Sequence, residues 1–149
     1  MTTANRFLVR AGFLLFLFAL LTGLAIPVFL NQKMALAAHV TGVVNGLLLV
    51  GLGLAWSLLS LTPTQGKLTT GLFLYGAYAN WGATCLAAAW GTSRLTPLSG
   101  AGHSAEAWQE TLVQVIQVTL ALAIIAGALL VVYALRSPSS KTSSSTPSP

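Results

Sequence analysis

Residues 11–30 read AGFLLFLFALLTGLAIPVFL, a run without a single charged side chain. A helix needs about 20 consecutive apolar residues to cross the hydrocarbon core of a bilayer, so the run predicts a membrane-spanning helix. A secretory signal peptide has a shorter apolar region, of about 7–15 residues, followed by a cleavage site with small residues. This run is longer and no convincing cleavage site follows it, so we expect the helix to be retained.

Three more apolar segments follow along the chain. The first helix is predicted over about 7–30, where Pro27 should kink or end it, and the others over about 36–61, 68–90 and 108–135. The connections at Asn31–Ala35 and Thr62–Lys67 are short, which makes consecutive helices antiparallel neighbours. We therefore expect an all-α membrane protein in which residues 1–136 form a bundle of four antiparallel transmembrane helices. The Ser-, Thr- and Pro-rich residues 137–149 are predicted to be a disordered tail.

The composition points the same way. Of the 149 residues, 6% are charged and 55% hydrophobic, whereas soluble domains carry about 25% charged residues. The net charge of +5 comes from cations scattered between the apolar runs, so we expect no nucleic-acid partner. In the predicted topology one side carries Arg6, Arg10, Lys67, Arg136 and Lys141, and the other carries Lys33 and Arg94. The positive-inside rule then places both termini in the cytoplasm.

Two polar side chains stand out in the second predicted helix, His39 and Asn45. Burying an imidazole or an amide in lipid is costly, so such groups invite a functional explanation. They point about 120° apart on a helix and therefore cannot jointly bind one ion. An interfacial histidine and an asparagine that joins two helices are the alternatives. Gly42 and Gly46 would let another backbone, or a flat ligand such as a cofactor, come close.

The third predicted helix carries two adjacent stripes at helical spacing. One stripe consists of Gly76, Asn80 and Thr84, and the other of Tyr78, Trp81 and Cys85. Aromatic rings beside an amide suit an aromatic ligand, with stacking area and a directed hydrogen bond. The lone cysteine is interpreted as a small buried hydrophobe.

Several kinds of site are missing from the sequence. It contains no HExxH motif, P-loop or Ser/His/Asp set, and no motif for NAD or flavin. The second histidine, His103, falls in the predicted loop 91–107. A haem would therefore have a single axial ligand from the protein and an open iron face, which favours chemistry over electron relay. Trp90 and Trp108 lie at predicted helix ends, as residues of an interfacial aromatic belt do.

The polar and aromatic residues recur in a familiar order. The motifs are Ala38-His39-x-x-Gly42-x-x-Asn45-Gly46, Tyr75-Gly76-x-Tyr78-Ala79-Asn80-Trp81, Ala89-Trp90-Gly91-Thr92, Thr96-Pro97-Leu98-x-Gly100-x-Gly102-His103 and Trp108-Gln109-Glu110. Together they closely resemble hydroxylaminobenzene mutase over about residues 7–135. That family comprises small bacterial membrane proteins that convert hydroxylaminobenzene to 2-aminophenol. The resemblance implies a multi-pass protein of the bacterial inner membrane.

The second and third predicted helices are also similar to styrene oxide isomerase. That family is a homotrimer with haem b held between subunits. The resemblance implies that His39 is the axial ligand of the haem iron and that Asn45 and Asn80 face the substrate. The chain departs from the isomerase at Gly76, where that family has an aspartate, and at Thr84, where it has a tyrosine. Epoxide isomerisation is therefore less expected, and Tyr78 becomes a candidate for positioning the substrate.

These resemblances predict a Bamberger-type rearrangement in which the hydroxyl moves from nitrogen to the ortho carbon. Asn45, Asn80 and Tyr78 are the predicted catalytic residues, and Trp81 and Thr84 pack the substrate. His39, Gly42 and Gly46 are the predicted residues for haem b, whose open iron would act as a Lewis acid. A haem-binding redox or sensing protein and a carrier bundle without cofactor are the rival hypotheses. Because His39 and Asn45 point about 120° apart, we expect a site between protomers, with His39 from one protomer and the asparagines from its neighbour.

Overall fold

The computed structural model describes residues 3–136, and within that range helices are the only regular secondary structure of the chain. In chain order it forms α1 (Thr3–Ala25), η1 (Ile26–Val28), α2 (Gln32–Ala55), η2 (Trp56–Leu58), α3 (Pro63–Trp90), α4 (Pro97–Gly100) and α5 (Ala107–Leu135). The all-α prediction is confirmed for these residues. The predicted tail at 137–149 lies outside them.

Three segments are long and apolar enough to cross a membrane: Asn5–Val28, Gln32–Leu58 and Ala107–Leu135. They correspond to the first, second and fourth predicted spans. Helix α3 has 28 residues, which is long enough, but its tyrosines, threonines and Asn80 make it the least apolar of the long helices. Because three of its helices are long and apolar enough to cross a bilayer, the chain is a membrane protein.

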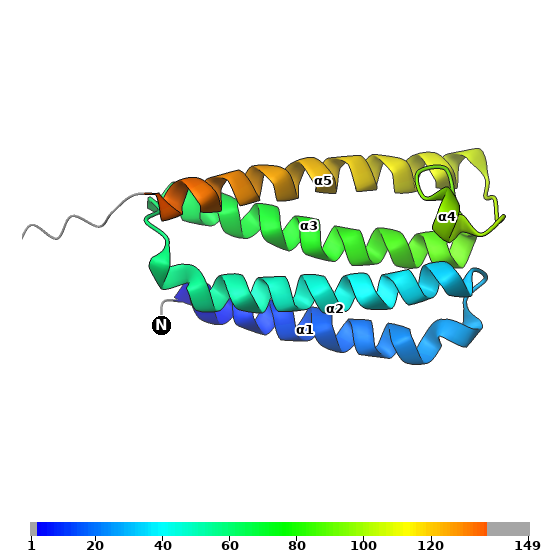
Figure 1. Ribbon diagram of the computed structural model, residues 1–149, viewed down its shortest axis with the longest axis horizontal. Helices are drawn as coiled ribbons and strands as arrows, with labels where there is room; N and C mark the ends of the chain where they lie inside the picture. Colours follow the sequence, from blue (N-terminus) through cyan, green and yellow to red (C-terminus); the bar gives the residue numbers. More distant parts are fainter. Residues whose placement is uncertain (1–2, 137–149) are drawn as a thin grey trace, which may run out of the picture.

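The long helices lie side by side, as Figure 1 shows. Helices α1 and α2 pack into one hairpin and α3 and α5 into a second, and the contact of α2 with α3 joins the two. The beginning of α1, the α2–α3 connection and the end of α5 lie at one end of the molecule, and α4 lies at the other (Figure 1). We call these the terminal end and the loop end.

Helix α1 ends at Ala25, because Pro27 falls in the short 3₁₀ turn that follows. The next helix begins at Gln32, four residues before the predicted start. The side chain of Asn31 accepts a hydrogen bond of 3.0 Å from the Met34 amide and so caps α2. The predicted connection Asn31–Ala35 is therefore wrong, since all but its first residue is helical.

The third long helix also begins early, at Pro63 instead of residue 68. Thr62 and Gln65 form a reciprocal capping box, in which each side chain accepts the other's backbone N–H at 3.3 and 2.9 Å. Proline at the first helical position suits this start, since its missing N–H would be unpaired there anyway. Helix α2 ends at Ala55, before the predicted residue 61, and α5 begins within one residue of its predicted position.

Glycines let α1 and α2 touch backbone to backbone. A Cβ atom on Gly46 would lie 2.8 Å from the carbonyl oxygen of Gly12, and one on Gly12 would lie 2.6 Å from that of Gly46. Both distances are shorter than real Cβ contacts. Beside this contact lies a buried apolar cluster from α1, α2 and α3 made by Leu8, Leu15, Leu49, Leu52, Phe73 and Ala77.

The last helix, α5, packs chiefly against α3. The side chain of Ile124 fills the space beside Gly76, and Phe73 fills the space beside Gly127. Much of the remaining surface of α5 is exposed leucine, isoleucine and valine, including Leu122 at 64% and Leu129 at 65%. Such a surface suits lipid, not water.

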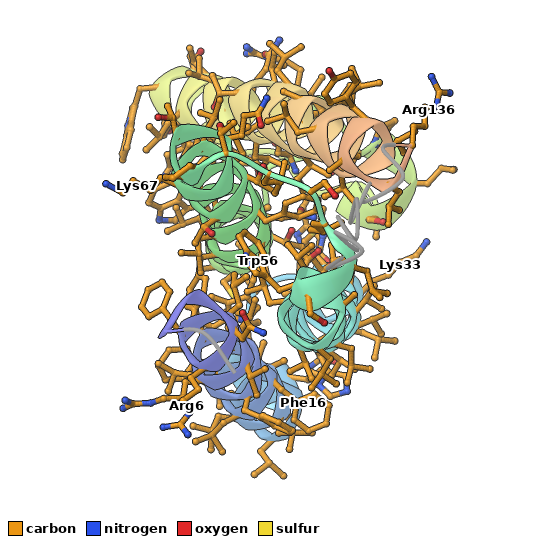
Figure 2. The ribbon with its side chains drawn as sticks, turned by 90° about the vertical axis from the view of Figure 1, so that its left-hand side faces the viewer. Arg6, Phe16, Lys33, Trp56, Lys67 and Arg136 are labelled. Carbon is orange, nitrogen blue, oxygen red and sulfur yellow. The ribbon has the colours of Figure 1, made fainter. Side chains whose placement is uncertain are left out.

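The cations divide between the two ends as the sequence predicts. Figure 2 looks onto the terminal end and shows Arg6, Lys67 and Arg136 pointing outward from α1, α3 and the end of α5. At the loop end, Lys33 donates a 2.6 Å hydrogen bond to the carbonyl of Leu98, and Arg94 lies within 3.5 Å of Gln114. Lys141 lies outside the described residues.

Candidate active site

His39 turns its ring toward α1. Its Nδ1 lies 2.8 Å from the carbonyl oxygen of Ala19. Because a carbonyl oxygen can only accept a hydrogen bond, Nδ1 carries a hydrogen, and in the neutral imidazole Nε2 then has the lone pair. Within residues 3–136 Nε2 has no hydrogen-bond partner. The half-buried imidazole is thus oriented through one nitrogen and offers the other as a ligand.

Protein fills the space beside the two glycines predicted to face a flat cofactor. A Cβ on Gly42 would lie 2.7 Å from both Ala19 and Trp81, and one on Gly46 would meet Gly12 and Phe16. Within the protomer these glycines therefore admit a neighbouring helix. This is the helix-packing alternative that the sequence left open.

Trp81 is fixed where α1, α2 and α3 meet. Its indole N–H donates to Thr22 Oγ1 at 3.1 Å, and that hydroxyl donates to the carbonyl of Phe18 at 2.9 Å. The Trp81 ring stacks on Phe18, with ring centroids 5.6 Å apart and planes at 19°. Since Ala19 contacts both Gly42 and His39, the tryptophan lies next to the segment of α1 that holds the histidine.

Asn45 is buried, with 7% of its surface exposed, and its side-chain Nδ2 has no hydrogen-bond partner. It lies one turn before Leu49, which belongs to the buried cluster shared by α1, α2 and α3, so helical spacing puts the amide on the inward face of α2. Leaving a buried N–H unpaired costs about 1–3 kcal/mol. A protein keeps such a group more readily where a ligand can satisfy it.

Asn80 belongs to the stripe of α3 that faces α5. One turn earlier, Gly76 is covered by Ile124, and one turn later the Thr84 hydroxyl donates to the Asn80 carbonyl at 2.7 Å. The Asn80 side chain is half-buried and makes no hydrogen bond within the described chain. No hydrogen bond in this part of the chain joins His39, Asn45 and Asn80, which are on different interhelical faces.

Tyr78 holds α3 to α1. Its hydroxyl donates to the Ala11 carbonyl at 2.8 Å, so its hydrogen is already used, and the oxygen can still accept. A second tyrosine, Tyr75, shares a 2.7 Å hydrogen bond with the Thr119 hydroxyl of α5. The two tyrosines therefore tie α3 to two different helices.

With this geometry in place, comparison with known proteins identifies the family. The model of the styrene oxide isomerase family matches residues 4–136. The chain belongs to this family. Among curated proteins, the hydroxylaminobenzene mutase HabB of Ectopseudomonas oleovorans is 38% identical over 143 residues, covering 95% of this chain and 87% of HabB. HabA of the same organism is 35% identical over 130 residues, covering 87% and 96%. No solved structure matches.

This member of the styrene oxide isomerase family is therefore an isomerase, since the family and both relatives are named for isomerisations. The predicted resemblance is confirmed. The residue roles it implies, at His39, Asn45 and Asn80, stay predictions.

At the loop end of this family member, two buried side chains, to which the sequence alone assigned no role, make hydrogen bonds to the backbone of the loop. The carboxylate of Glu110, 8% exposed, accepts the backbone N–H groups of Ser93 and Arg94 at 2.9 and 3.0 Å. The buried side chain of Asn31 donates to the carbonyls of Ser99 and Gly100 at 2.9 and 3.0 Å. Together they hold the 91–106 loop over the end of the bundle.

The signals for these residues were present in the sequence. Glu110 is one of two acids in the chain, and Asn31 directly precedes a helix. The side chain of His103 packs against Gly91, since a Cβ added to Gly91 would lie 3.1 Å from the Cβ of His103. His103 is therefore part of the packing of the loop. Trp90 and Trp108 contact each other edge to face, with centroids 5.3 Å apart.

Proposed function

We propose that the protein is a hydroxylaminobenzene mutase, which converts hydroxylaminobenzene to 2-aminophenol. The observation that carries this proposal is the 38% identity to a hydroxylaminobenzene mutase over 95% of the chain. In the reaction the N–O bond breaks and a C–O bond forms at the ortho carbon. The ortho carbon loses a proton and the nitrogen gains one. Oxidation state is unchanged overall, so neither NAD nor a flavin is needed.

Haem b is the proposed cofactor, with His39 as its protein ligand. The residues present fit this group. The 2.8 Å hydrogen bond from Nδ1 to the Ala19 carbonyl oxygen fixes the direction of the ring and leaves Nε2 available as a ligand for iron. When bound, haem supplies a Lewis-acidic iron that stabilises the charge developing on the leaving oxygen. The chain's own contribution is to fix the tautomer and direction of the imidazole through α1.

The two asparagines and the aromatic residues would bind the substrate. The unpaired Nδ2 of Asn45 is a donor for the hydroxylamino oxygen, and the Asn80 amide could hold the nitrogen. The indole of Trp81, fixed by Thr22 and Phe18, offers a flat wall for the ring. Tyr78 and Thr84 would complete the packing around it. An apolar surrounding keeps water from the ring while the oxygen migrates.

We further propose that the site is completed between protomers of a homotrimer. His39 and Asn45 diverge on α2, and the free Nε2 of His39 has no partner in its own protomer. A neighbouring protomer would then bring its asparagines to that ring. Each protomer would span the bacterial inner membrane four times, with the terminal end and both termini in the cytoplasm.

The test uses detergent-purified protein and hydroxylaminobenzene. We expect 2-aminophenol as product without oxygen-18 from labelled water, because the hydroxyl is transferred internally. Substantial label in the product would mean attack by solvent. His39→Ala should lose haem absorbance and turnover together, whereas His103→Ala, which changes the chain's other histidine, should keep both. Full turnover by haem-free His39→Ala protein would remove the haem from the proposal.

The family name favours epoxide isomerisation as a second candidate. Against it, the resemblance to styrene oxide isomerase implies an aspartate where this chain has Gly76, and Ile124 fills the space beside Gly76. Supplying styrene oxide to the same preparation distinguishes the candidates. We expect turnover of hydroxylaminobenzene to exceed that of the epoxide.

A further inference from the structure

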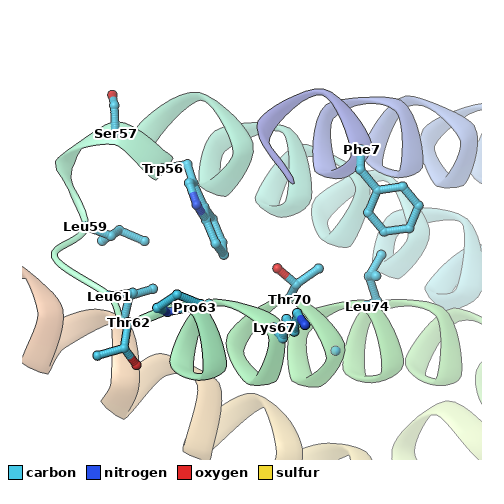
Figure 3. Close-up of a pocket in the computed structure, with 12 residues that line it drawn as sticks. Phe7, Trp56, Ser57, Leu59, Leu61, Thr62, Pro63, Lys67, Thr70 and Leu74 are labelled. Carbon is cyan, nitrogen blue, oxygen red and sulfur yellow. The ribbon is translucent and has the colours of Figure 1, made fainter. Parts of the chain in front are cut away.

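A long groove runs between α1 and α3 from the terminal end of the molecule. Its outer part is a cavity of about 860 Å³ whose lining includes Phe7, Trp56, Lys67, Thr70 and Leu74. Figure 3 shows Phe7 of α1 above Leu74 of α3, and the Trp56 ring reaching from the end of α2 toward α3. The outer part is thus apolar with one ammonium group in its wall.

The groove continues along α1 as a second cavity of about 750 Å³. The two cavities are contiguous because Phe7 and Leu74 line both. The inner part is lined by Arg10, Leu14 and Leu17 and ends near Tyr78. From Phe7 to Leu17 a helix rises about 15 Å, which is much of the length of an acyl chain inside one leaflet, about 15 Å deep.

Two cations line this groove, Arg10 and Lys67, and a third, Arg6, lies one turn before Arg10 on α1. Arg6 and Arg10 come from the first turns of α1 and Lys67 from α3, and none of them has a hydrogen bond or ion pair within residues 3–136. In Figure 2, Arg6 and Lys67 lie on the same flank, on either side of the opening between α1 and α3. The cations of the loop end differ, since Lys33 and Arg94 each contact a protein acceptor.

No acidic side chain of the protein lies near these three cations. Its two acids, Glu106 and Glu110, both lie at the start of α5, and the helix is 29 residues long, about 40 Å. A second copy inserted in the same direction would bring further cations to this level and no acidic side chain. An anionic lipid headgroup at the bilayer surface supplies the charge and also an acyl chain for the apolar groove.

We propose that the groove between α1 and α3 binds one anionic phospholipid, with its phosphate between Arg10 and Lys67 and an acyl chain along Leu14 and Leu17. Trp56 lies at the mouth, at the headgroup level where tryptophan is favoured. The flexible cationic side chains reach the phosphate while their aliphatic stems stay in the apolar wall. His39 and Asn45 of α2 line neither cavity, so the two sites share only Tyr78, at the inner end of the groove.

The experiment measures lipid retained by full-length protein in nanodiscs of equimolar phosphatidylglycerol and phosphatidylcholine. After transfer to detergent, native mass spectrometry counts the lipids bound per chain. We expect one phosphatidylglycerol per chain. The variant Arg10→Gln/Lys67→Gln should retain at least about tenfold less. The matched control Arg94→Gln/Arg136→Gln removes the same charge elsewhere and should retain the wild-type amount.

A second pair of variants tests the apolar part of the site. A Cβ on Gly71 meets no atom within 4 Å, and Gly71 lines the outer cavity, so Gly71→Leu narrows the groove without a clash inside the protomer. Gly51→Leu is the control, because a Cβ on Gly51 also meets no atom within 4 Å and Gly51 lines neither cavity of the groove. We expect Gly71→Leu to lose the lipid and Gly51→Leu to keep it, with both variants unfolding at the wild-type temperature.

Three results would overturn the proposal. One is equal retention of the two lipid classes by the wild-type protein. Another is loss of phosphatidylglycerol from both double variants alike, which would indicate attraction by net charge alone. The third is a change in oligomer mass in Gly71→Leu with lipid retention intact, which would make the groove an interface between copies of the chain.

Discussion

His39 Nδ1 and the Ala19 carbonyl oxygen are 2.8 Å apart, so the orientation of the imidazole on α2 is set by the backbone of α1. The relationship depends on Gly23, because a Cβ there would lie 2.7 Å from Nδ1 and 3.0 Å from Cε1. The hairpin of α1 and α2 is thereby more than a membrane anchor. It sets which nitrogen of the ring carries the lone pair.

Gly23→Ala should therefore impair the protein although no proposed catalytic residue is changed. The new methyl group displaces the ring and breaks its hydrogen bond, so we expect a shifted haem absorbance and a lower kcat in the turnover of hydroxylaminobenzene. Gly51→Ala is the control, since its Cβ meets no atom within 4 Å. Wild-type absorbance and turnover in Gly23→Ala would show that the ring position has no influence.

Asn45→Leu should separate activity from stability. Because the Asn45 Nδ2 is buried without a partner, an apolar side chain of similar size removes a desolvation cost of about 1–3 kcal/mol. We expect an equal or higher unfolding temperature and no turnover. Thr69→Val changes the other buried side-chain atom that has no hydrogen-bond partner within residues 3–136, and it should stabilise the protein with turnover intact. A strongly destabilised Asn45→Leu protein would instead indicate that the amide serves packing.

Trp81 and Thr22 should be energetically coupled. Their hydrogen bond is 3.1 Å long, and a bond of this kind contributes about 0.5–1.5 kcal/mol to stability. In a double-mutant cycle, Trp81→Phe and Thr22→Val should each destabilise, and the second change should cost less once the first is present. Trp108→Phe combined with Thr22→Val should be additive, because these residues lie at different places in the bundle. Additivity in both cycles would contradict the coupling.

Glu110→Gln should loosen the loop end. The carboxylate accepts two backbone N–H groups, whereas an amide offers one oxygen, so we expect a loss of about 1–3 kcal/mol in the free energy of unfolding. Limited proteolysis should cut residues 93–106 faster. The control is Glu106→Gln, which changes the exposed N-cap residue of α5 and leaves the bonds of Glu110 to Ser93 and Arg94 in place; it should cost less stability than Glu110→Gln. Equal cleavage of both variants would argue against this role.

The helices could be predicted from the sequence more completely than the contacts of the candidate site. The apolar runs predicted each long helix, because exclusion from water depends on composition alone. The starts of α2 and α3 were predicted late, since capping by Asn31 and by Thr62 with Gln65 is local chemistry inside segments assigned to connections. Both caps have a signal in the sequence: an asparagine precedes the apolar stretch of α2, and a Thr-x-x-Gln motif precedes that of α3.

At the site, His39 and Asn45 could be predicted because polar groups in an apolar helix are conspicuous, and helical spacing set their divergence. The contacts of His39 with Ala19 and of Trp81 with Thr22 could not be predicted. They join residues 20 and 59 positions apart, and the register between helices that creates them depends on glycine packing across the α1–α2 contact.

The division into two hairpins has a consequence for how the protein is made. Helix α3 is the least apolar long helix, and its Gly76 and Phe73 are covered by Ile124 and Gly127 of α5. When α3 leaves the ribosome, α5 has not yet been synthesised, so within its own chain α3 can pack only against the earlier helices α1 and α2. Stable insertion of α3 should therefore depend on the pairing of α2 with it, and the second hairpin would mature only when α5 arrives. Biogenesis, like the orientation of His39, thus rests on the first hairpin.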